Sequence, residues 1–220
     1  MLEIISMEID CEMPNEVFAE LLSKVSPEKR ERVGRFAHRR GAVNTLMGEI
    51  MARYMVCART GLQNNELKFA VGEYGKPYLL NDLDIQFNIS HSGDIIVCAV
   101  SAEPVGIDVE LIKPINLKLA ERFFHADENA YILAQADKEE AFFEIWTKKE
   151  SYIKREGTSI PLNSFNVLRN PDRFISIDVL PGASCHVCVE NESVGSHVRY
   201  RLSELLPEAE GGFSIAGTTI

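Results

Sequence analysis

Two acidic residues lie two positions apart in a segment typical of a β-strand, V-G-I-D-V-E at 105–110. Side chains alternate between the faces of a strand, so the apolar residues at 105, 107 and 109 would enter the core, and Asp108 and Glu110 would emerge together on the other face. A second segment, W-T-K-K-E-S-Y-I-K at 146–154, is typical of a helix and puts Lys154 one turn after Glu150. Three carboxylates and an ammonium that converge can hold Mg²⁺ against a phosphate-bearing substrate.

Each of these segments is common when taken alone, because a D-x-E strand is usually a polar sheet face and a lysine-rich helix is usually a solvated one. Phosphate chemistry, however, requires further cationic and hydroxyl groups. G-K-P at 75–77 and F-N-I-S-H-S-G at 87–93 supply them upstream and in order. The joint occurrence therefore favours a phosphate-handling site.

The elements that would position these groups can be read from hydrophobic periodicity and from start and stop residues. Up to residue 111 we expect strands over 2–9, 67–71, 85–90, 94–101 and 105–111, and helices over 15–25 and 40–60. A further helix should start at Ser26-Pro27. In the second part we expect helices over 117–124, 126–134 and 138–156, and strands over 174–179, 185–189, 197–201 and 213–217.

This order of elements predicts an α+β fold made of two similar halves related by a pseudo-twofold axis, residues 1–103 and 104–220. Helices would pack on a small, mainly antiparallel sheet in each half. The active site would then lie in the cleft between the halves. The acidic strand opens the second half and would lie beside its long helix.

Composition limits the function further. The chain has 220 residues, 45% of them hydrophobic, and a formal net charge of −10, which argues against general nucleic-acid binding. Seven of the 23 basic residues nevertheless lie between Lys24 and Arg40, and such a patch suits a compact polyanion. Five scattered cysteines indicate a reducing compartment, and Cys185-His186-Val187-Cys188 lacks the second half of a zinc site. We expect a cytoplasmic protein that does not span a membrane.

Four motifs, G-K-P, F-N-I-S-H-S-G, V-G-I-D-V-E and W-T-K-K-E-S-Y-I-K, resemble in order and spacing the signature of the Sfp-type 4′-phosphopantetheinyl transferases. The resemblance covers nearly the whole chain. It implies transfer of the 4′-phosphopantetheine arm of coenzyme A to a serine of an apo acyl or peptidyl carrier protein, with release of adenosine 3′,5′-bisphosphate. It also implies that residues 1–103 bind coenzyme A and that residues 104–220 carry the Mg²⁺ site and the catalytic helix.

The resemblance assigns Mg²⁺ to Asp108, Glu110 and Glu150. It implies catalytic roles for Glu150, as the general base, and for Lys154, at the pyrophosphate. It places coenzyme A binding on Lys29, Arg32, Thr45, Lys76, Ser90, His91 and Lys154. Arg32 stands where the family has lysine, which keeps the charge but changes its geometry. Glu128 also lies in a family-like segment, and its role stays open at this point.

Two other readings remain. A coenzyme A hydrolase would use the same residues with water as the attacking group, so only the acceptor distinguishes it. A binding module without activity is disfavoured because all three acidic positions are intact. The sequence does not name the carrier protein, which could belong to fatty acid, polyketide or nonribosomal peptide synthesis. Because both halves lie in one polypeptide, we expect a monomer.

Overall fold

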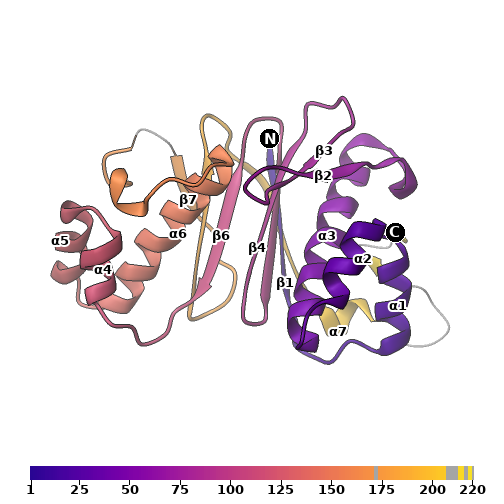
Figure 1. Ribbon diagram of the computed structural model, residues 1–220, viewed down its shortest axis with the longest axis horizontal. Coiled ribbons are helices and arrows are strands. Elements are labelled where there is room, and N and C mark those ends of the chain that lie inside the picture. The colour runs from indigo at the N-terminus through magenta and orange to yellow at the C-terminus, as the bar shows by residue number, and fades with distance from the viewer. Residues whose placement is uncertain (171–172, 207–212, 216–217, 220) are drawn as a thin grey trace.

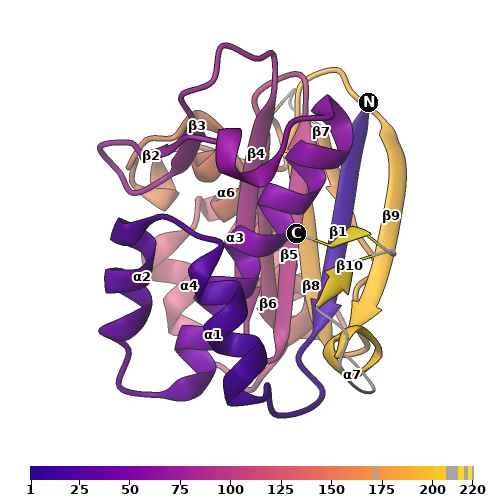
Figure 2. The same cartoon turned by 90° about the vertical axis from the view of Figure 1, so that its right-hand side faces the viewer.

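The computed structural model describes residues 1–170, 173–206, 213–215 and 218–219, and its main feature is a pair of β-sheets that face each other (Figure 1). The first sheet has the order β4-β5-β1-β9. Its strands are β1 (Leu2–Glu8), β4 (Gln86–Ser92), β5 (Ile95–Ser101) and β9 (Val194–Arg201). β1 and β5 pair antiparallel, whereas β9 joins β1 in parallel from the far end of the chain. Figure 2 shows β9 at the edge of this sheet beside β1.

The second sheet has the order β6-β8-β7 and is antiparallel. Its strands are β6 (Gly106–Leu111), β7 (Arg173–Ser176) and β8 (Ala183–Val189). Helices cover the outer face of each sheet, as Figures 1 and 2 show. The first sheet carries α1 (Asn15–Ser23), α2 (Pro27–Gly34) and α3 (Arg39–Thr60), and the second carries α4 (Lys118–Phe123), α5 (Ala126–Ala134) and α6 (Lys138–Glu156).

Short elements complete the described chain. They are the hairpin of β2 (Phe69–Val71) and β3 (Pro77–Leu79), the 3₁₀ turns Asn64–Glu66 and Leu162–Ser164, α7 (Leu202–Leu205), β10 (Ser214–Ile215) and β11 (Thr218–Thr219). The sequence did not predict β3 or α7. Part of the strand expected over 213–217 lies outside the described residues. The mixed α+β class and the small, mostly antiparallel sheets are confirmed.

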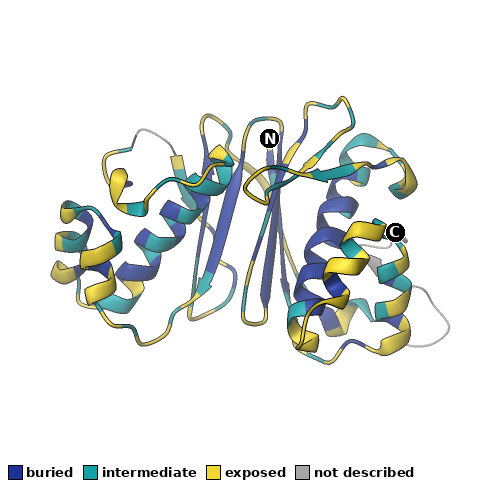
Figure 3. Ribbon diagram, viewed as in Figure 1, coloured by how far each residue is buried: buried dark blue, intermediate teal, exposed yellow. Residues whose placement is uncertain are grey.

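The core explains why the strands read as they do. Leu2 and Val97 of the first sheet pack with Ile107, Val109 and Val187 of the second, so the two sheets bury apolar faces against each other. The other face of the first sheet packs under α3, and every residue of β5 is consequently buried. Figure 3 shows this gradient from buried strands to exposed helix surfaces.

Local signals set the helix ends. The Ser26 hydroxyl accepts a hydrogen bond of 3.2 Å from the backbone N–H of Lys29 and caps α2, as predicted. Gly61 and Gly157 end α3 and α6 with φ angles of 75° and 64°, which favour glycine. In the part of the chain that the structure describes, no helix combines the length and the apolar character needed to cross a bilayer. The boundary at residue 103 stays a prediction.

Candidate active site

The carboxylate of Asp108 lies at the seam between the two halves, where β4 meets β6 and α6. Its Oδ1 accepts hydrogen bonds from the Ser90 hydroxyl at 2.9 Å and from the Lys154 ammonium at 2.6 Å. Lys154 also donates to the Ser90 hydroxyl at 2.8 Å. Asp108 and Ser90 are 4% and 6% exposed and Lys154 is partly exposed, so this polar group reaches from the core toward the surface. As the sequence predicted, Asp108 points away from the apolar face shared by Ile107 and Val109.

Side chains of β4, rather than its backbone, join the two sheets at this seam. Asn88, Ser90 and Ser92 all project toward β6. They accept hydrogen bonds of 2.9, 3.4 and 3.2 Å from the backbone N–H groups of Ile107, Val109 and Leu111. Because these N–H groups would otherwise be orphaned at a sheet edge, the β4 side chains replace a missing strand partner. The same contacts fix the acidic residues of β6 in place.

Glu110 and Glu150 complete the acidic group. The Ser92 hydroxyl donates to Glu110 Oε2 at 2.7 Å. Burial raises the pKa of Glu110, the bond from Ser92 lowers it, and the charge of Asp108 raises it. Burial also raises the pKa of Glu150, which the charges of Asp108 and Glu110 raise further while Lys154 lowers it. The four predicted side chains therefore influence one another electrostatically.

The buried carboxylate oxygen Asp108 Oδ2 has no hydrogen-bond partner. An orphaned carboxylate oxygen beside two further acids is chemically suited to a hard cation such as Mg²⁺. Among the described residues, however, no three His, Cys, Asp or Glu side chains already stand in an arrangement that could hold a metal. The Lys154 ammonium lies 2.6 Å from the other oxygen, Asp108 Oδ1, and neutralises its charge.

The position of α6 depends on a close backbone approach at Gly106. A Cβ atom at this position would lie 1.9 Å from the Ser151 carbonyl oxygen and 2.4 Å from the Arg155 backbone nitrogen. Glycine therefore lets α6 lie directly on β6. This contact brings Glu150 and Lys154 of α6 to the acids of the strand.

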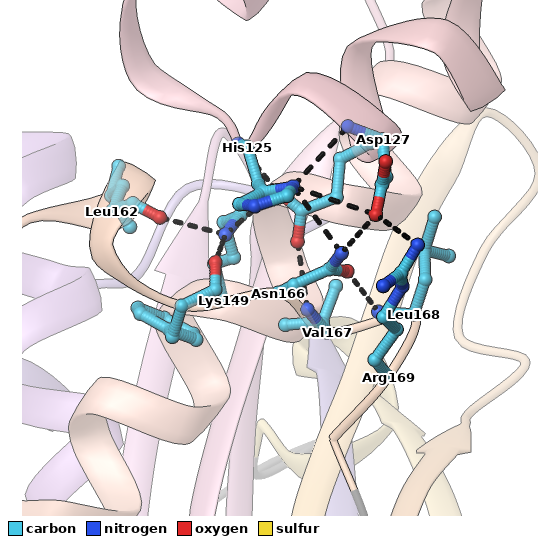
Figure 4. Close-up of polar contacts among 10 residues, drawn as sticks. His125, Asp127, Lys149, Leu162, Asn166, Val167, Leu168 and Arg169 are labelled. Atoms are coloured by element: carbon cyan, nitrogen blue, oxygen red, sulfur yellow. Dashed lines mark hydrogen bonds and ion pairs between the residues drawn. The ribbon is translucent and has the colours of Figure 1, made fainter.

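A buried ion pair fixes the other side of α6. Lys149 Nζ lies 2.8 Å from Glu128 Oε2 of α5, and both side chains are 0% exposed. Lys149 also donates to the carbonyl oxygens of Leu162 and Phe165, each at 2.7 Å (Figure 4). Glu128 accepts from the backbone N–H groups of Val167 at 2.7 Å and His125 at 2.9 Å.

This pair answers the question that the sequence left open for Glu128. Its carboxylate ties α5, α6 and the segment after α6 together in the core of the second half. The role seen in the structure is therefore structural. Sequence reasoning missed Lys149, although a helical count puts it within about 20° of Phe142 in the apolar stripe. A lysine at the centre of such a stripe is a usable signal of a buried pair.

The predicted coenzyme A residues of the first half lie on α2, α3 and β4, except Lys76, which lies in the turn between β2 and β3. His91 is exposed on β4 and projects opposite to Ser90, which is buried. Partial removal of its ring from water lowers the pKa of His91, and the charges of Lys154, Arg32 and Lys29 lower it further, so these cations act on one region. Lys29 lies 3.1 Å from Glu49 Oε2 of α3, which also pairs with Arg53 at 2.8 Å. Thr45 is 8% exposed.

Lys76 is held between the halves. Its ammonium donates to the carbonyl oxygens of Arg155 at 3.0 Å and Val105 at 3.2 Å. Burial lowers the pKa of Lys76 to about 8, with Glu156 raising it and Arg155 lowering it. These bonds attach the hairpin of β2 and β3 to the last turn of α6. The carbonyl that Lys76 contacts there belongs to Arg155, which directly follows Lys154. The phosphate-binding role of Lys76 stays a prediction.

Comparisons with known proteins agree on one family. Residues 104–203 match the 4′-phosphopantetheinyl transferase superfamily, and residues 13–103 match the family described as 4′-phosphopantetheinyl transferase, N-terminal. The chain is 39% identical over 183 residues to 4′-phosphopantetheinyl transferase Sfp of Bacillus subtilis, covering 81% of each chain. It is 41% identical over 174 residues to 4′-phosphopantetheinyl transferase gsp of Aneurinibacillus migulanus, covering 77% of this chain and 73% of that protein. HetI of Nostoc, a 4′-phosphopantetheinyl transferase, is 29% identical over 196 residues, covering 83% and 81%.

Proposed function

Since the chain belongs to the 4′-phosphopantetheinyl transferase family and is an enzyme of that kind, we propose that it moves the 4′-phosphopantetheine arm of coenzyme A to a serine hydroxyl of an apo carrier protein. Adenosine 3′,5′-bisphosphate would leave. The observation that carries this proposal is the ion pair of Asp108 with Lys154 at the seam, with Glu110 and Glu150 near enough for the charge of Asp108 to raise their pKa values.

The residues of the seam suit the charge that develops in this reaction. Phosphoryl transfer through a loose transition state spreads negative charge over the attacking, transferred and leaving oxygens. Lys154 already lies within hydrogen-bond distance of Asp108 and Ser90, and its ammonium can reorient toward a pyrophosphate oxygen. The serine of the carrier must also lose its proton. Glu150 is our candidate for that step, because a carboxylate with a raised pKa is a stronger base.

Three acids would hold Mg²⁺, namely Asp108, Glu110 and Glu150. The unpartnered oxygen of Asp108 and the mutual repulsion of the three carboxylates support this assignment. When bound, the metal would supply positive charge to the pyrophosphate oxygens and so assist departure of the bisphosphate. The chain's own residues would orient coenzyme A and activate the acceptor serine.

Coenzyme A would extend from this seam across the first half, residues 1–103. We assign its far phosphate to Lys29, Arg32 and Thr45, and its nearer phosphates to Lys76 and His91. Support comes from the shared electrostatic influence of Arg32, Lys29 and Lys154 on His91. Residues 104–220 would supply the acids and the catalytic helix. Because Ser90 and Asp108 meet within one polypeptide, a monomer suffices for this site.

We further propose a cytoplasmic location and an acyl or peptidyl carrier protein as partner. All five cysteines lie in the described part of the chain, and none is disulfide-bonded, which suits a reducing compartment. Carrier proteins of this class are acidic, and the net charge of this chain is −10. Docking should therefore depend on a local patch rather than on long-range attraction.

The decisive experiment measures the product on the carrier. Purified protein, Mg²⁺ and coenzyme A are incubated with apo carrier proteins from fatty acid, polyketide and nonribosomal peptide systems, and each carrier is weighed by mass spectrometry. We expect the phosphopantetheine mass on at least one carrier and equimolar bisphosphate release. Bisphosphate release that needs no carrier would show a hydrolase instead.

A matched pair of variants tests the site. Glu150→Gln should abolish transfer and retain coenzyme A binding by calorimetry, whereas Glu139→Gln removes the same charge from the first turn of the same helix and should leave transfer unchanged. Chelation by EDTA should stop the reaction, and added Mg²⁺ should restore it. Transfer by Glu150→Gln at the wild-type rate would refute the role given to Glu150.

A further inference from the structure

An ion-pair network joins α2 to α3, and two of its members, Glu49 and Arg53, have no part in the proposed reaction. Lys29 Nζ of α2 lies 3.1 Å from Glu49 Oε2 of α3. Arg53 follows Glu49 by one helical turn and places Nε and Nη2 at 2.9 and 2.8 Å from the other oxygen, Glu49 Oε1. One carboxylate is therefore shared between an arginine and a lysine.

Arg53 is a fixed anchor for this carboxylate. Its side chain is 4% exposed, and its Cζ lies 4.4 Å from the centroid of the Phe69 ring. Nη1 donates to Asn64 Oδ1 at 3.0 Å, and the Asn64 amide donates in turn to the Lys24 carbonyl oxygen at 2.9 Å. Separate parts of the chain thus hold the guanidinium in place, and the guanidinium holds Glu49.

Lys29 needs such a partner if it is to bind a ligand at one place. A lysine ammonium sits on a flexible four-carbon stem and loses rotamer entropy when it is fixed. The contact with Glu49 orients Lys29 before any ligand binds, so less of this entropy is lost on binding. An ammonium has three N–H groups, and the contact with Glu49 leaves donors for an anion.

The network lies beside the residues assigned to the far phosphate of coenzyme A. Thr45 precedes Glu49 by one turn, so both side chains lie on the same side of α3. The charge of Lys29 also lowers the pKa of His91, so the ammonium acts on the region in front of β4. Because two cations share one carboxylate, the network keeps a positive charge in excess.

We propose that Glu49, anchored by Arg53, is a positioning residue that holds Lys29 for the 3′-phosphate of coenzyme A. The inference rests on the proposed function, which assigns Lys29 to that phosphate. Glu49 and Arg53 touch neither the phosphate nor the reacting atoms and act through Lys29. They thereby set the preference of the enzyme for coenzyme A over 3′-dephospho-coenzyme A.

The test compares these two substrates on each variant, with kcat/KM for transfer to an apo carrier protein as the readout. Both substrates are measured on one preparation, so any loss of folded protein cancels in the ratio. Glu49→Gln should reduce the preference for coenzyme A by about two- to fivefold, which is the effect of one partly exposed ion pair. The loss should appear in KM rather than in kcat.

Positioning and charge alone predict opposite signs for Glu49→Gln. Removing a negative charge near a bound phosphate would by itself increase the preference for coenzyme A. Releasing Lys29 from its partner decreases that preference. An unchanged or increased preference would therefore overturn the proposal.

A double-mutant cycle tests whether Glu49 acts through Lys29. Lys29→Met should reduce the preference by about tenfold or more, because it removes a charge-assisted bond to the phosphate. In the Lys29→Met background, Glu49→Gln should cause no further loss of preference. An equal loss from Glu49→Gln in both backgrounds would refute the proposal, and so would a wild-type preference in Lys29→Met.

Glu31→Gln is the matched control, because it removes the same charge from α2, where Glu31 forms an exposed ion pair with Arg35. It should keep the wild-type preference, and a loss as large as that of Glu49→Gln would overturn the proposal. If Glu49→Gln does not fold, Glu49→Asp keeps a charge opposite Arg53 but draws it away from Lys29. This variant should also lose preference for coenzyme A, and a wild-type ratio would count against the proposal.

Failure of this inference is distinct from failure of the proposed function. A wild-type protein that transfers phosphopantetheine from neither substrate to any carrier would overturn both. Transfer by the wild type, with a substrate preference that does not respond to Glu49→Gln, would overturn the positioning role alone.

Discussion

Replacing Lys149 by methionine tests whether the buried pair with Glu128 stabilises the second half. The Lys149 ammonium makes three short contacts, with Glu128 and with the carbonyl oxygens of Leu162 and Phe165, and has no exposure to water. Methionine fills similar space but leaves a buried carboxylate without its cation. Removing one partner of such a pair costs about 3–5 kcal/mol. That is a large share of the roughly 5–15 kcal/mol by which domains are stable.

Equilibrium unfolding in urea measures this loss. Lys148→Met is the matched control, because it makes the same substitution one residue earlier in a partly exposed pair, and it should cost about 1 kcal/mol or less. Combining Lys149→Met with Glu128→Leu should cost less than the sum of the two single changes, by about 0.5–3 kcal/mol. The double variant should still be less stable than the wild type, because the backbone groups that bonded the pair lose their partners.

Additive single changes, or a Lys149→Met loss no larger than that of Lys148→Met, would refute the reasoning. If Lys149→Met does not fold, Glu128→Gln gives the same test in a milder form. It keeps an oxygen that can accept from the backbone and removes the negative charge. An unfolding free energy equal to that of the wild type would then show that the charge does not matter.

Three further outcomes follow from the described contacts. Gly106→Ala should destabilise the protein by several kcal/mol in urea unfolding, because its Cβ would lie 1.9 Å from the Ser151 carbonyl oxygen, whereas Gly34→Ala meets nothing within 4 Å and should be neutral or stabilising. Ser92→Ala should cost about 1 kcal/mol or less in the same assay, because water can replace the lost acceptor of the exposed Leu111 N–H. The folded-state pKa of His186, about 4, lies below its ordinary value of 6.5, so the unfolded chain binds the extra proton between these values, and stability should fall by about 3 kcal/mol as pH drops from 6.5 to 4. Thermal unfolding of wild type and His186→Phe across that range checks this, since the variant should lack this part of the slope.

Much of the fold could be predicted because its signals are local. Ser26 caps α2, glycines end α3 and α6, and alternation in 105–111 separates the acidic face from the apolar one. The pairing of strands that are far apart in the sequence could not be predicted from such local signals. β9 joins β1 in parallel across almost the whole chain, and no local pattern specifies a partner at that separation.

In the candidate site, too, local patterns were predictable and contacts between distant residues were not. Periodicity and motif order indicated that Asp108 and Lys154 would lie on facing elements, and the structure joins them at 2.6 Å. The sequence predicted that the Lys154 ammonium would converge with the three acids, but it did not specify that Lys154 would pair with one oxygen of Asp108. Lys149 escaped notice because lysine is rarely buried, and its partner Glu128 lies 21 residues earlier on a different helix.

The side chains that β4 extends to β6 also decide how the two strands can slide. Acceptors at 88, 90 and 92 repeat every second residue, so a slip of two residues would still satisfy most N–H groups of β6. The same slip would leave only one serine opposite an acid, either Ser92 at Asp108 or Ser90 at Glu110, in place of the two native pairs. The native alignment therefore makes one more serine–acid hydrogen bond than its nearest competitor, so residues proposed to bind phosphate and metal also favour the correct pairing of the two sheets.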